Sequence, residues 1–523
     1  MDKTRRRKEN ENKNLNLIKN EVCICNEKFS DTLEQSIDGE FLLPDYYPDI
    51  ARILKCKGTA KILTKSFHTS GVTVMGTVMI SLFYIDHADS RVRCYQATVG
   101  FTKEISADIQ TENGKIDVSC CLDYLNCRLS TPRKFDIHGT VSMRVEIKEN
   151  ESVPLLSKCD DKHMQLKTKQ IDHTKEIVST ERSVSLNEEL EVTPSLSGIS
   201  SVLFAEATPI FLECRTVTGK AIVKGDLHLR ILYDDIHGDI KTHETNVAFS
   251  QILDANGMDE YCDCDVSMDL SSLEVRTRTG MDGECRSINL SATVLIKLIV
   301  SKTTPETIVV DAYSTEYEIV AETQHHHFDR RLQSLDETFT VSERFDFPQA
   351  ISKVLDTWCF VKYDNCKTEQ GSITVNALLC CEVLALTQDQ TPIYLEKTFE
   401  FSQQFPLKIK DVSDLLLDPQ LIVLAETYTL TGETAAEIRC EVRLISPVFT
   451  RLPLIAIAQI KTDPERKKEQ DRDISLVVYF ARCGESVWEI ARKYNTSCAA
   501  IAASNRLKED HIEQDQMLMI PII

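Results

Sequence analysis

The sequence has little glycine, with only 17 glycines in 523 residues. Loops that cradle phosphate groups need several glycines close together. Neither a P-loop nor a Gly-x-Ser-x-Gly or His-Glu-x-x-His motif occurs. The low counts of glycine and proline also argue against collagen-like or low-complexity material. We therefore expect a protein that is not an enzyme, with no catalytic residues and no cofactor.

The sequence also lacks long apolar runs. No stretch of about 18 apolar residues occurs, so we expect no transmembrane segment. The first 21 residues, MDKTRRRKENENKNLNLIKNE, are basic but have no apolar core of a signal peptide. The 19 cysteines are an odd number, and so many thiols would risk mispairing outside a reducing compartment. We therefore expect a cytoplasmic protein whose buried cysteines act as small hydrophobic residues.

An excess of positive charge is missing as well. The formal net charge is −21, from 60 Lys and Arg residues against 81 Asp and Glu residues. Because binding to a phosphate backbone requires a positive surface, we expect no nucleic acid as the main partner. Hydrophobic residues make up 42% of the chain and charged residues 27%, which is typical of globular proteins. The length leaves room for about three or four domains.

What the sequence does contain is a threefold repeat. The octapeptides SIDGEFLL, SLNEELEV and SLDETFTV begin at Ser36, Ser185 and Ser334, at intervals of 149 residues. Downstream of each octapeptide, a pattern Ile-x-x-Ile/Val-Leu recurs from Ile50, Ile199 and Ile351. A period this long indicates separate domains, because solenoid units are much shorter.

Within a repeat the hydrophobic pattern is mainly that of β-strands. Residues 72–84 read VTVMGTVMISLFY, in which apolar side chains alternate with a period of two, and residues 227–233 alternate in the same way. Regular amphipathic helices between the strands are missing, which argues against a parallel α/β fold. We expect a mainly β protein with three repeated antiparallel, sandwich-like domains, each with one short helix near residues 49–54 of the first repeat or its equivalents.

These observations divide the chain into six parts. We expect a disordered basic tail (1–30), three β repeats (31–180, 181–330 and 331–460), a charged linker (461–473, KTDPERKKEQDRD) and a small C-terminal domain (474–523).

The C-terminal segment predicts the order strand, helix, helix, strand. Gly484-Glu485-Ser486 interrupts a strand, and Ser486 with Glu489 has the spacing of a capping box at the start of a helix. Apolar residues follow at helical spacing, and a second helix is expected before a closing strand. The residues expected to form the core or otherwise to be structural are Trp488, Ile490, Tyr494, Asn505, Leu507, Ile520 and Pro521.

This segment resembles a LysM module, from the opening Gly484-Glu485-Ser486 to the closing Gln516–Pro521. Cys483 and Asp515 depart from the usual pattern of the module. LysM modules generally bind N-acetylglucosamine polymers in a shallow groove between two loops. The resemblance implies a groove formed by Gly484, Glu485, Ser486, Val487, Lys508, Glu509, Asp510, His511 and Ile512. Such a groove can serve a glycan or a protein partner, and both alternatives stay open.

A second resemblance concerns almost the whole chain. Residues 43–50 read LPDYYPDI. Together with the β repeats and the C-terminal module, this motif resembles the SPOCS-domain spore-coat morphogenetic proteins of spore-forming Firmicutes, with a SipL-like architecture. The resemblance implies a mother-cell protein at the forespore surface, whose LysM module docks the coat-basement ATPase SpoIVA. Binding of peptidoglycan or cortex glycan is the alternative, and self-association of the repeats also stays open.

Four small clusters contain residue types that can ligate metals. In a strand, adjacent side chains point to opposite faces, so three consecutive histidines cannot all hold one ion. The two Cys-x-Cys pairs have no second pair at zinc-finger spacing, and the two aspartates of LPDYYPDI have no counterparts in the other repeats. We therefore expect no metal site. The clusters are Asp45 with Asp49, His325–His327, Cys23 with Cys25, and Cys262 with Cys264.

Overall fold

The protein is mainly β, as expected. The computed structural model describes residues 16–68, 71–106, 114–191, 198–279, 285–369, 371–408, 414–468 and 474–522. Within these ranges the helices are α1 (Val487–Lys493) and α2 (Cys498–Asn505). In the described part of the chain, no helix is long and apolar enough to cross a membrane.

The β-strands follow one another in three similar groups. The first group is β1 (Leu17–Leu42), β2 (Ile50–His68), β3 (Gly71–Asp86), β4 (Val92–Ser106), β5 (Lys115–Thr131) and β6 (Lys134–Cys159). The second is β7 (Met164–Glu191), β8 (Ile199–Val217), β9 (Lys220–Asp235), β10 (Ile240–Asp254), β11 (Asp263–Thr279) and β12 (Cys285–Ser314). The third is β13 (Tyr317–Asp346), β14 (Ile351–Glu369), β15 (Ser372–Thr387), β16 (Pro392–Pro406), β17 (Leu415–Leu417), β18 (Gln420–Leu430) and β19 (Ala435–Lys467).

Each group folds into a sandwich of two antiparallel sheets. The second, third and fourth strands form one sheet, with orders β2-β3-β4, β8-β9-β10 and β14-β15-β16. The first and last strands pair in the other sheet, and β5, β11 or β18 pairs with the last strand. Alternating residues of β3 such as Val74, Val78 and Ile80 are fully buried between the two sheets of the first sandwich. The period-two pattern of the sequence therefore marks the core-facing side of each strand.

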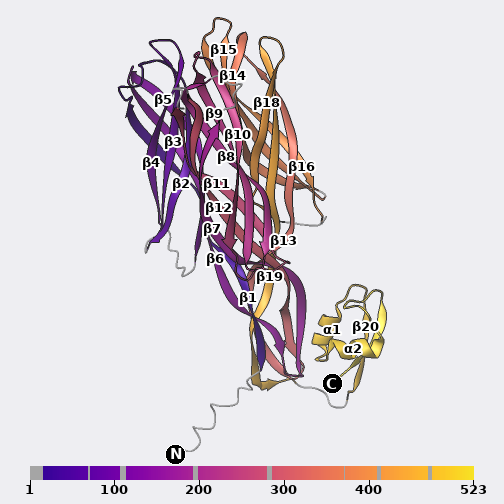
Figure 1. The fold of residues 1–523 in the computed structure, drawn as a ribbon. Coiled ribbons are helices and arrows are strands. Elements are labelled where there is room, and N and C mark those ends of the chain that lie inside the picture. The colour runs from indigo at the N-terminus through magenta and orange to yellow at the C-terminus, as the bar shows by residue number, and fades with distance from the viewer. Residues whose placement is uncertain are drawn as a thin grey trace, which may run out of the picture.

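The three sandwiches share a further core at their centre. Phe83, Leu232 and Leu384 lie at matching positions of β3, β9 and β15, and they meet in one buried cluster. Figure 1 shows the three sandwiches side by side. Each central strand is therefore buried on both faces near its end, because one face packs on its own sandwich and the other on the neighbouring repeats.

The prediction of a short helix near residues 49–54 is wrong, because strand β2 begins at Ile50. Two β-bulges, between Ile50 and Arg52 and between Ile53 and Lys55, interrupt the register with β3. Each bulge inserts one extra residue, so the buried residues recur at a spacing of three that imitates a helix. Bulges occur at the equivalent places of β8 and β14.

The recurring Ile-x-x-Ile/Val-Leu pattern thus records a double bulge rather than a helix. The bulges turn the strand, so that Ile50 packs in its own sandwich whereas Leu54 packs in the shared central core. Leu203 and Leu355 lie in the same central core. The motif therefore joins each sandwich to the other two.

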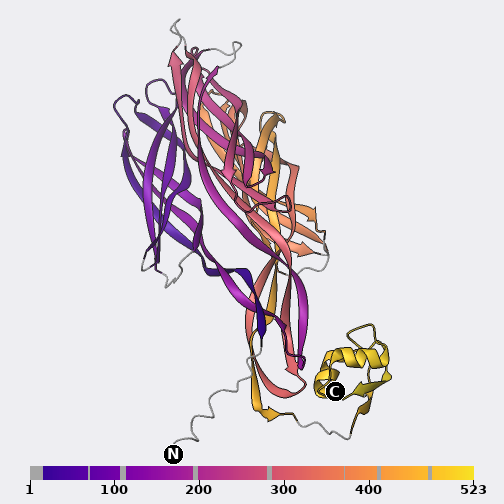
Figure 2. The same ribbon diagram turned by 60° about the horizontal axis from the view of Figure 1, so that its bottom comes forward.

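The first and last strands of each group continue beyond the sandwiches as three two-stranded ribbons. We call these parts the stalk, and it consists of residues 17–27, 148–159, 164–176, 301–314, 317–331 and 449–467. Register shifts between Glu27 and Phe29, Val300 and Ser301, and Arg331 and Gln333 separate the stalk from the sandwiches. The ribbons bury two small apolar clusters between them, and Figures 1 and 2 show the stalk from two directions.

The stalk corrects the expected domain boundaries. Residues 17–30 belong to β1 rather than to a disordered tail, and β19 runs on to Lys467 inside the expected linker. The boundaries expected at 180/181 and 330/331 fall inside β7 and β13. The repeated octapeptides lie in the sandwich halves of these long strands, so they mark where each sandwich begins and not where each strand begins.

Candidate binding site

The C-terminal domain has the predicted order of elements, strand β20 (Leu476–Ala481), α1, α2 and strand β21 (Gln516–Pro521). Ser497 begins α2 with a side chain that accepts a hydrogen bond from the Ala500 backbone N–H at 3.1 Å. Ser486 takes the N-cap position of α1 without a side-chain cap bond. Asn505, at the end of α2, binds both the N–H and the C=O of Met519, each at 2.7 Å. Asn505 therefore fastens α2 to the edge of β21.

The core of this domain contains most of the residues that the sequence placed there. Ile490 and Ile520 are buried, whereas Tyr494, Leu507 and Pro521 are half-buried and line the cluster or its edge. Tyr494 stacks edge-on against Tyr479.

The two loops expected to form a groove lie against each other. Backbone hydrogen bonds join Gly484 N–H to the Ile512 carbonyl at 2.7 Å, Val487 N–H to the Asp510 carbonyl at 2.9 Å and Ile512 N–H to the Glu485 carbonyl at 2.9 Å. Ser486 and His511 form an isolated β-bridge between them. The side chains of Val487 and Ile512 are buried, those of Glu485 and Ser486 are half-buried, and Gly484 and the run from Lys508 to His511 (including Glu509 and Asp510) are exposed. The surface that these loops present is therefore mostly polar and charged.

The hairpin of β20 and β21 presents an apolar surface that the sequence reasoning missed. Its outward face consists of Leu476, Val478, Phe480, Met517 and Met519, and we call it the hairpin face. Val478 pairs with Met519 and Phe480 with Met517, and Met517 is 71% exposed. The uninterrupted apolar run LVVYF could have signalled it, because such a run places apolar side chains on both faces of a strand.

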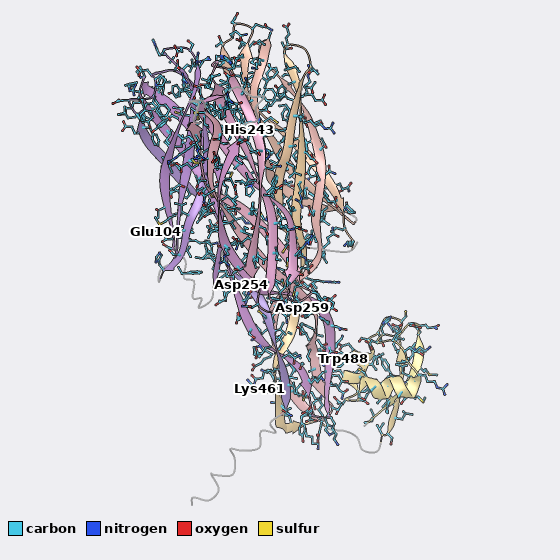
Figure 3. All side chains as sticks on the ribbon, viewed as in Figure 1. Glu104, His243, Asp254, Asp259, Lys461 and Trp488 are labelled. Carbon is cyan, nitrogen blue, oxygen red and sulfur yellow. The ribbon has the colours of Figure 1, made fainter. Side chains whose placement is uncertain are left out.

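Trp488 connects the C-terminal domain to the stalk. Its indole N–H donates a hydrogen bond to Asp311 Oδ2 at 2.8 Å, and its ring meets that of Tyr313 edge-on at 4.8 Å between centroids. Both Asp311 and Tyr313 belong to the stalk end of β12. Trp488 is only 8% exposed in this arrangement, and Figure 3 shows it between the stalk and the domain. The residue that we expected to be a core residue of the domain therefore also belongs to its interface.

Further polar contacts complete this interface between the C-terminal domain and the stalk, which we call the seat. The Tyr313 hydroxyl donates to the Thr496 carbonyl at 2.7 Å, and Arg492 forms an ion pair with Asp311 at 3.1 Å. Lys468 donates to Asn495 Oδ1 at 2.8 Å. Burial raises the pKa of the Tyr313 hydroxyl, so this group stays a neutral donor. In Figures 1 and 2 helix α1 faces the stalk and the hairpin lies on the far side, so the seat directs the hairpin face away from the stalk.

The LPDYYPDI segment forms a loop around one arginine. Arg133 donates to the carbonyls of Leu43, Pro44 and Tyr47 at 2.8–3.2 Å, and to Asp49 Oδ1 at 2.6 Å. An arginine fork that satisfies several carbonyls at once fixes the course of a loop. Asp49 is thus used to hold Arg133, and the motif is structural in this fold.

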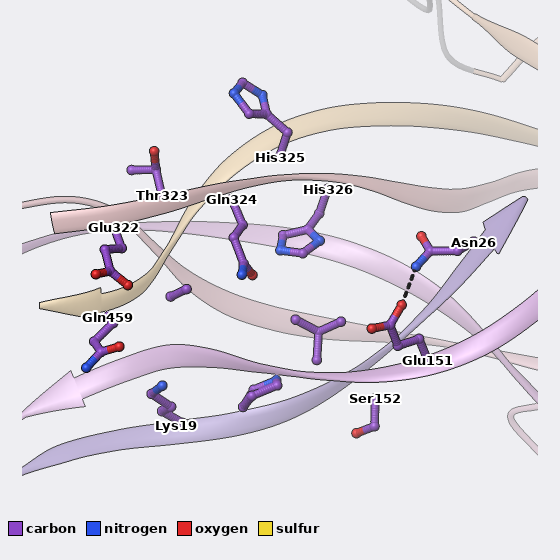
Figure 4. Close-up of a pocket in the computed structure, with 13 residues that line it drawn as sticks. Lys19, Asn26, Glu151, Ser152, Glu322, Thr323, Gln324, His325, His326 and Gln459 are labelled. Carbon is purple, nitrogen blue, oxygen red and sulfur yellow. Dashed lines mark hydrogen bonds between the residues drawn. The ribbon is translucent and has the colours of Figure 1, made fainter. Parts of the chain in front are cut away.

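A polar cavity of about 570 Å³ lies in the stalk between β1, β6, β13 and β19, as Figure 4 shows. Its lining includes His325 and His326, two of the three consecutive histidines. Nε2 of His326 is buried without a hydrogen-bond partner, and burial lowers the pKa of this imidazole. Asn26 donates to Glu151 at 2.7 Å across one end of the cavity. Among the described residues, no group of three or more His, Cys, Asp or Glu side chains has the geometry to hold a metal ion.

Comparison with known proteins follows the same division of the chain. The family model described as SipL, SPOCS domain, matches residues 49–130 and 198–277. The LysM domain model matches residues 482–521. No curated protein and no solved structure matched the chain. The chain therefore contains SPOCS-domain segments in its first two β repeats and a LysM domain at residues 482–521, as the two resemblances indicated.

Proposed function

Because the chain carries the SPOCS domain of SipL proteins twice, together with a LysM domain, we propose that it is a non-catalytic assembly protein of spore-coat formation. In this proposal it acts in the mother cell at the forespore surface. Its LysM domain binds another protein there, the coat-basement ATPase SpoIVA, while the β repeats serve as the scaffold that holds the LysM domain.

The observation that carries this proposal is the exposed hairpin face. Five large apolar side chains on two paired strands form a contiguous surface, and the outward positions of both strands carry no charged residue. Contiguous apolar patches on a protein surface are typical of protein–protein interfaces. The seat of Trp488 on Asp311 supports the same function, because a fixed domain presents this face without first losing rotational freedom.

Binding of N-acetylglucosamine polymers is the second candidate function. It is favoured by the LysM match at residues 482–521. In this alternative the ligand lies on the polar loop surface, from Gly484 to Val487 and from Lys508 to Ile512, and not on the hairpin face. The two functions therefore use different surfaces of one small domain and can be separated by substitution.

The test is a titration of the full chain against the purified ATPase and, separately, against N-acetylglucosamine hexamer. Phe480→Glu places a charge in the middle of the hairpin face, where the side chain is 60% exposed and its replacement does not open a core. Glu485→Lys changes the loop surface. Ala503→Glu, at an exposed position of α2, adds the same charge elsewhere and is the matched control.

We expect the ATPase to bind the unmodified chain and the Ala503→Glu variant alike, and Phe480→Glu to weaken binding at least tenfold with an unchanged circular dichroism spectrum. Saturable hexamer binding that Glu485→Lys abolishes, with no binding of the ATPase, would overturn the proposal in favour of the glycan function.

A further inference from the structure

All 19 cysteines have free thiols, and seven of them lie against another thiol. These seven form three groups, one in each β repeat. Cys56 interacts with Cys127 in the first repeat and Cys214 with Cys264 in the second. In the third repeat Cys359 interacts with both Cys381 and Cys440. The groups were not visible in the sequence, because their members are up to 81 residues apart.

Each group joins the two sheets of its sandwich. Cys56 is on β2 and Cys127 on β5, Cys214 is on β8 and Cys264 on β11, and Cys359 is on β14 whereas Cys440 is on β19. The members of each group pack against the same apolar core. Cys359 also lies directly opposite Cys381 in the register of β14 and β15, with 3.6 Å between the two sulfur atoms. The thiols are therefore held close together by the strands on which they lie.

The three contacts are not copies of one inherited feature. The repeat positions that match Cys56 hold Ala205 and Thr357. The positions that match Cys214 hold Lys65 in the first repeat and Cys366 in the third, and Cys366 belongs to none of the three groups. Each sandwich thus brings thiols together from its two sheets, but at positions along the strands that are not equivalent in the three repeats. Three separate placements of this kind point to a chemical use of the contact and not only to packing.

The surroundings suit oxidation. In each group one thiol accepts a hydrogen bond from its neighbour, which lowers the pKa of Cys127, Cys214 and Cys440 and favours the nucleophilic thiolate. In the first two groups the same thiol, Cys127 or Cys214, is also half-buried, so a small oxidant can reach it. In the third group the half-buried thiol is Cys359, whereas Cys440 is buried. The remaining sulfur is then already in place to complete a disulfide.

We propose that the three groups are cross-linking sites, each of which a peroxide converts into one disulfide: Cys56–Cys127, Cys214–Cys264, and Cys359 with Cys440 or Cys381. A thiolate attacks one oxygen of hydrogen peroxide and the O–O bond breaks, which gives a sulfenic acid and hydroxide. The neighbouring thiol then attacks the sulfenic sulfur, the S–S bond forms and water leaves. For each disulfide two thiols lose two electrons and two protons, and the peroxide becomes two molecules of water.

The consequence is a change in the fold's resistance to unfolding without a change in its surface. The first two cross-links each join the two sheets of one sandwich, from β2 to β5 and from β8 to β11. Each closes a long loop, and such a cross-link stabilises the fold mainly by restricting the unfolded chain. This role does not depend on the partner of the LysM domain.

The test uses the full chain, reduced and then freed of reductant. A few equivalents of hydrogen peroxide are added, remaining thiols are alkylated, and peptides are mapped by mass spectrometry without reduction. We expect cross-linked peptides for the three groups, and a rise in the unfolding temperature that dithiothreitol reverses.

Two variants and a control sharpen the result. Cys127→Ser and Cys214→Ser should each remove one cross-link and leave the other two. Cys121→Ser, an exposed neighbour on β5, should leave all three. Oxidation confined to the exposed thiols of Cys25, Cys121 and Cys483, or cross-links distributed among unrelated cysteines, would overturn the proposal.

Discussion

Replacement of Glu426 by Gln should stabilise the protein at pH 8 and have a much smaller effect at pH 5, where most of the loss due to Glu426 ionisation has not yet occurred. Glu426, on β18, and Asp356, on β14, both form ion pairs with Arg230 of the second repeat. Burial is the main cause that raises the pKa of Glu426 to about 7 and of Asp356 to about 6. One guanidinium thus serves two buried carboxyl groups, and a further carboxyl, Glu206, raises the pKa of both.

The direction in which the free energy of unfolding changes with pH follows from proton linkage. A carboxyl group whose pKa is higher in the folded state binds protons more tightly there than in the unfolded chain, so the free energy of unfolding falls as the pH rises. For Glu426 this loss begins near the ordinary pKa of 4.5 and is complete above about 7. At 1.36 kcal/mol per pKa unit the shift corresponds to roughly 3 kcal/mol.

Gln resembles the protonated form of Glu426 at every pH, so the variant should regain about 1–3 kcal/mol at pH 8. The measurement is urea-induced unfolding at pH 5, 6, 7 and 8. Glu437→Gln, an exposed residue of β19, is the matched control and should show no change in pH dependence. If Glu426→Gln instead lowers stability at pH 8 by about 3–5 kcal/mol, the ion pair is net stabilising and the reasoning fails.

Three further predictions concern the seat, the loop and the shared core. Asp311→Ala leaves the Trp488 indole N–H without its acceptor, which should weaken the contact between the C-terminal domain and the stalk by about 1–2 kcal/mol. Tryptophan fluorescence should shift to the red and trypsin should cut faster after Lys467, whereas unchanged cleavage would contradict this contact. Arg133→Ala removes the donor of three loop carbonyls and should make the LPDYYPDI loop a faster site of chymotrypsin cleavage, whereas cleavage at the normal rate would mean that other contacts hold the loop. Phe83→Ala should cost roughly 3–5 kcal/mol in thermal unfolding because its ring fills the core shared by the three sandwiches; Tyr46→Ala, an exposed control, should have no effect.

The class of fold and the identity of the C-terminal domain could be predicted because both depend on local patterns. A period of two in residues such as Val78 and Ile80 identifies a half-buried strand without knowledge of its partner. The order strand, helix, helix, strand near the C-terminal end is likewise encoded by nearby residues, such as Ser497 at the start of α2. The threefold repeat was visible because equivalent residues keep a regular distance along the chain.

Local patterns predicted the wrong structure where the pairing of two strands decides it. Ile50, Ile53 and Leu54 have helical spacing in the sequence, but this segment pairs with β3 as a strand. Two bulges in β2 insert the extra residues that produce the helix-like spacing. The long strands of the stalk were divided at the wrong places, because the polar residues of their stalk halves carry no clear alternation. Their partners lie more than 100 residues away, as in the pairing of Leu17 with Cys159.

By itself, then, the sequence determined which segments form strands and helices and that three similar domains precede a LysM domain. Only the tertiary structure decided which faces of these elements remain free and which distant groups meet. Trp488 is covered by Asp311 and Tyr313, and the thiols of Cys56 and Cys127 come together across a sandwich. The physical reason is that hydrogen bonding, burial and pKa depend on neighbours in space, and in this antiparallel protein those neighbours are mostly far apart in the chain.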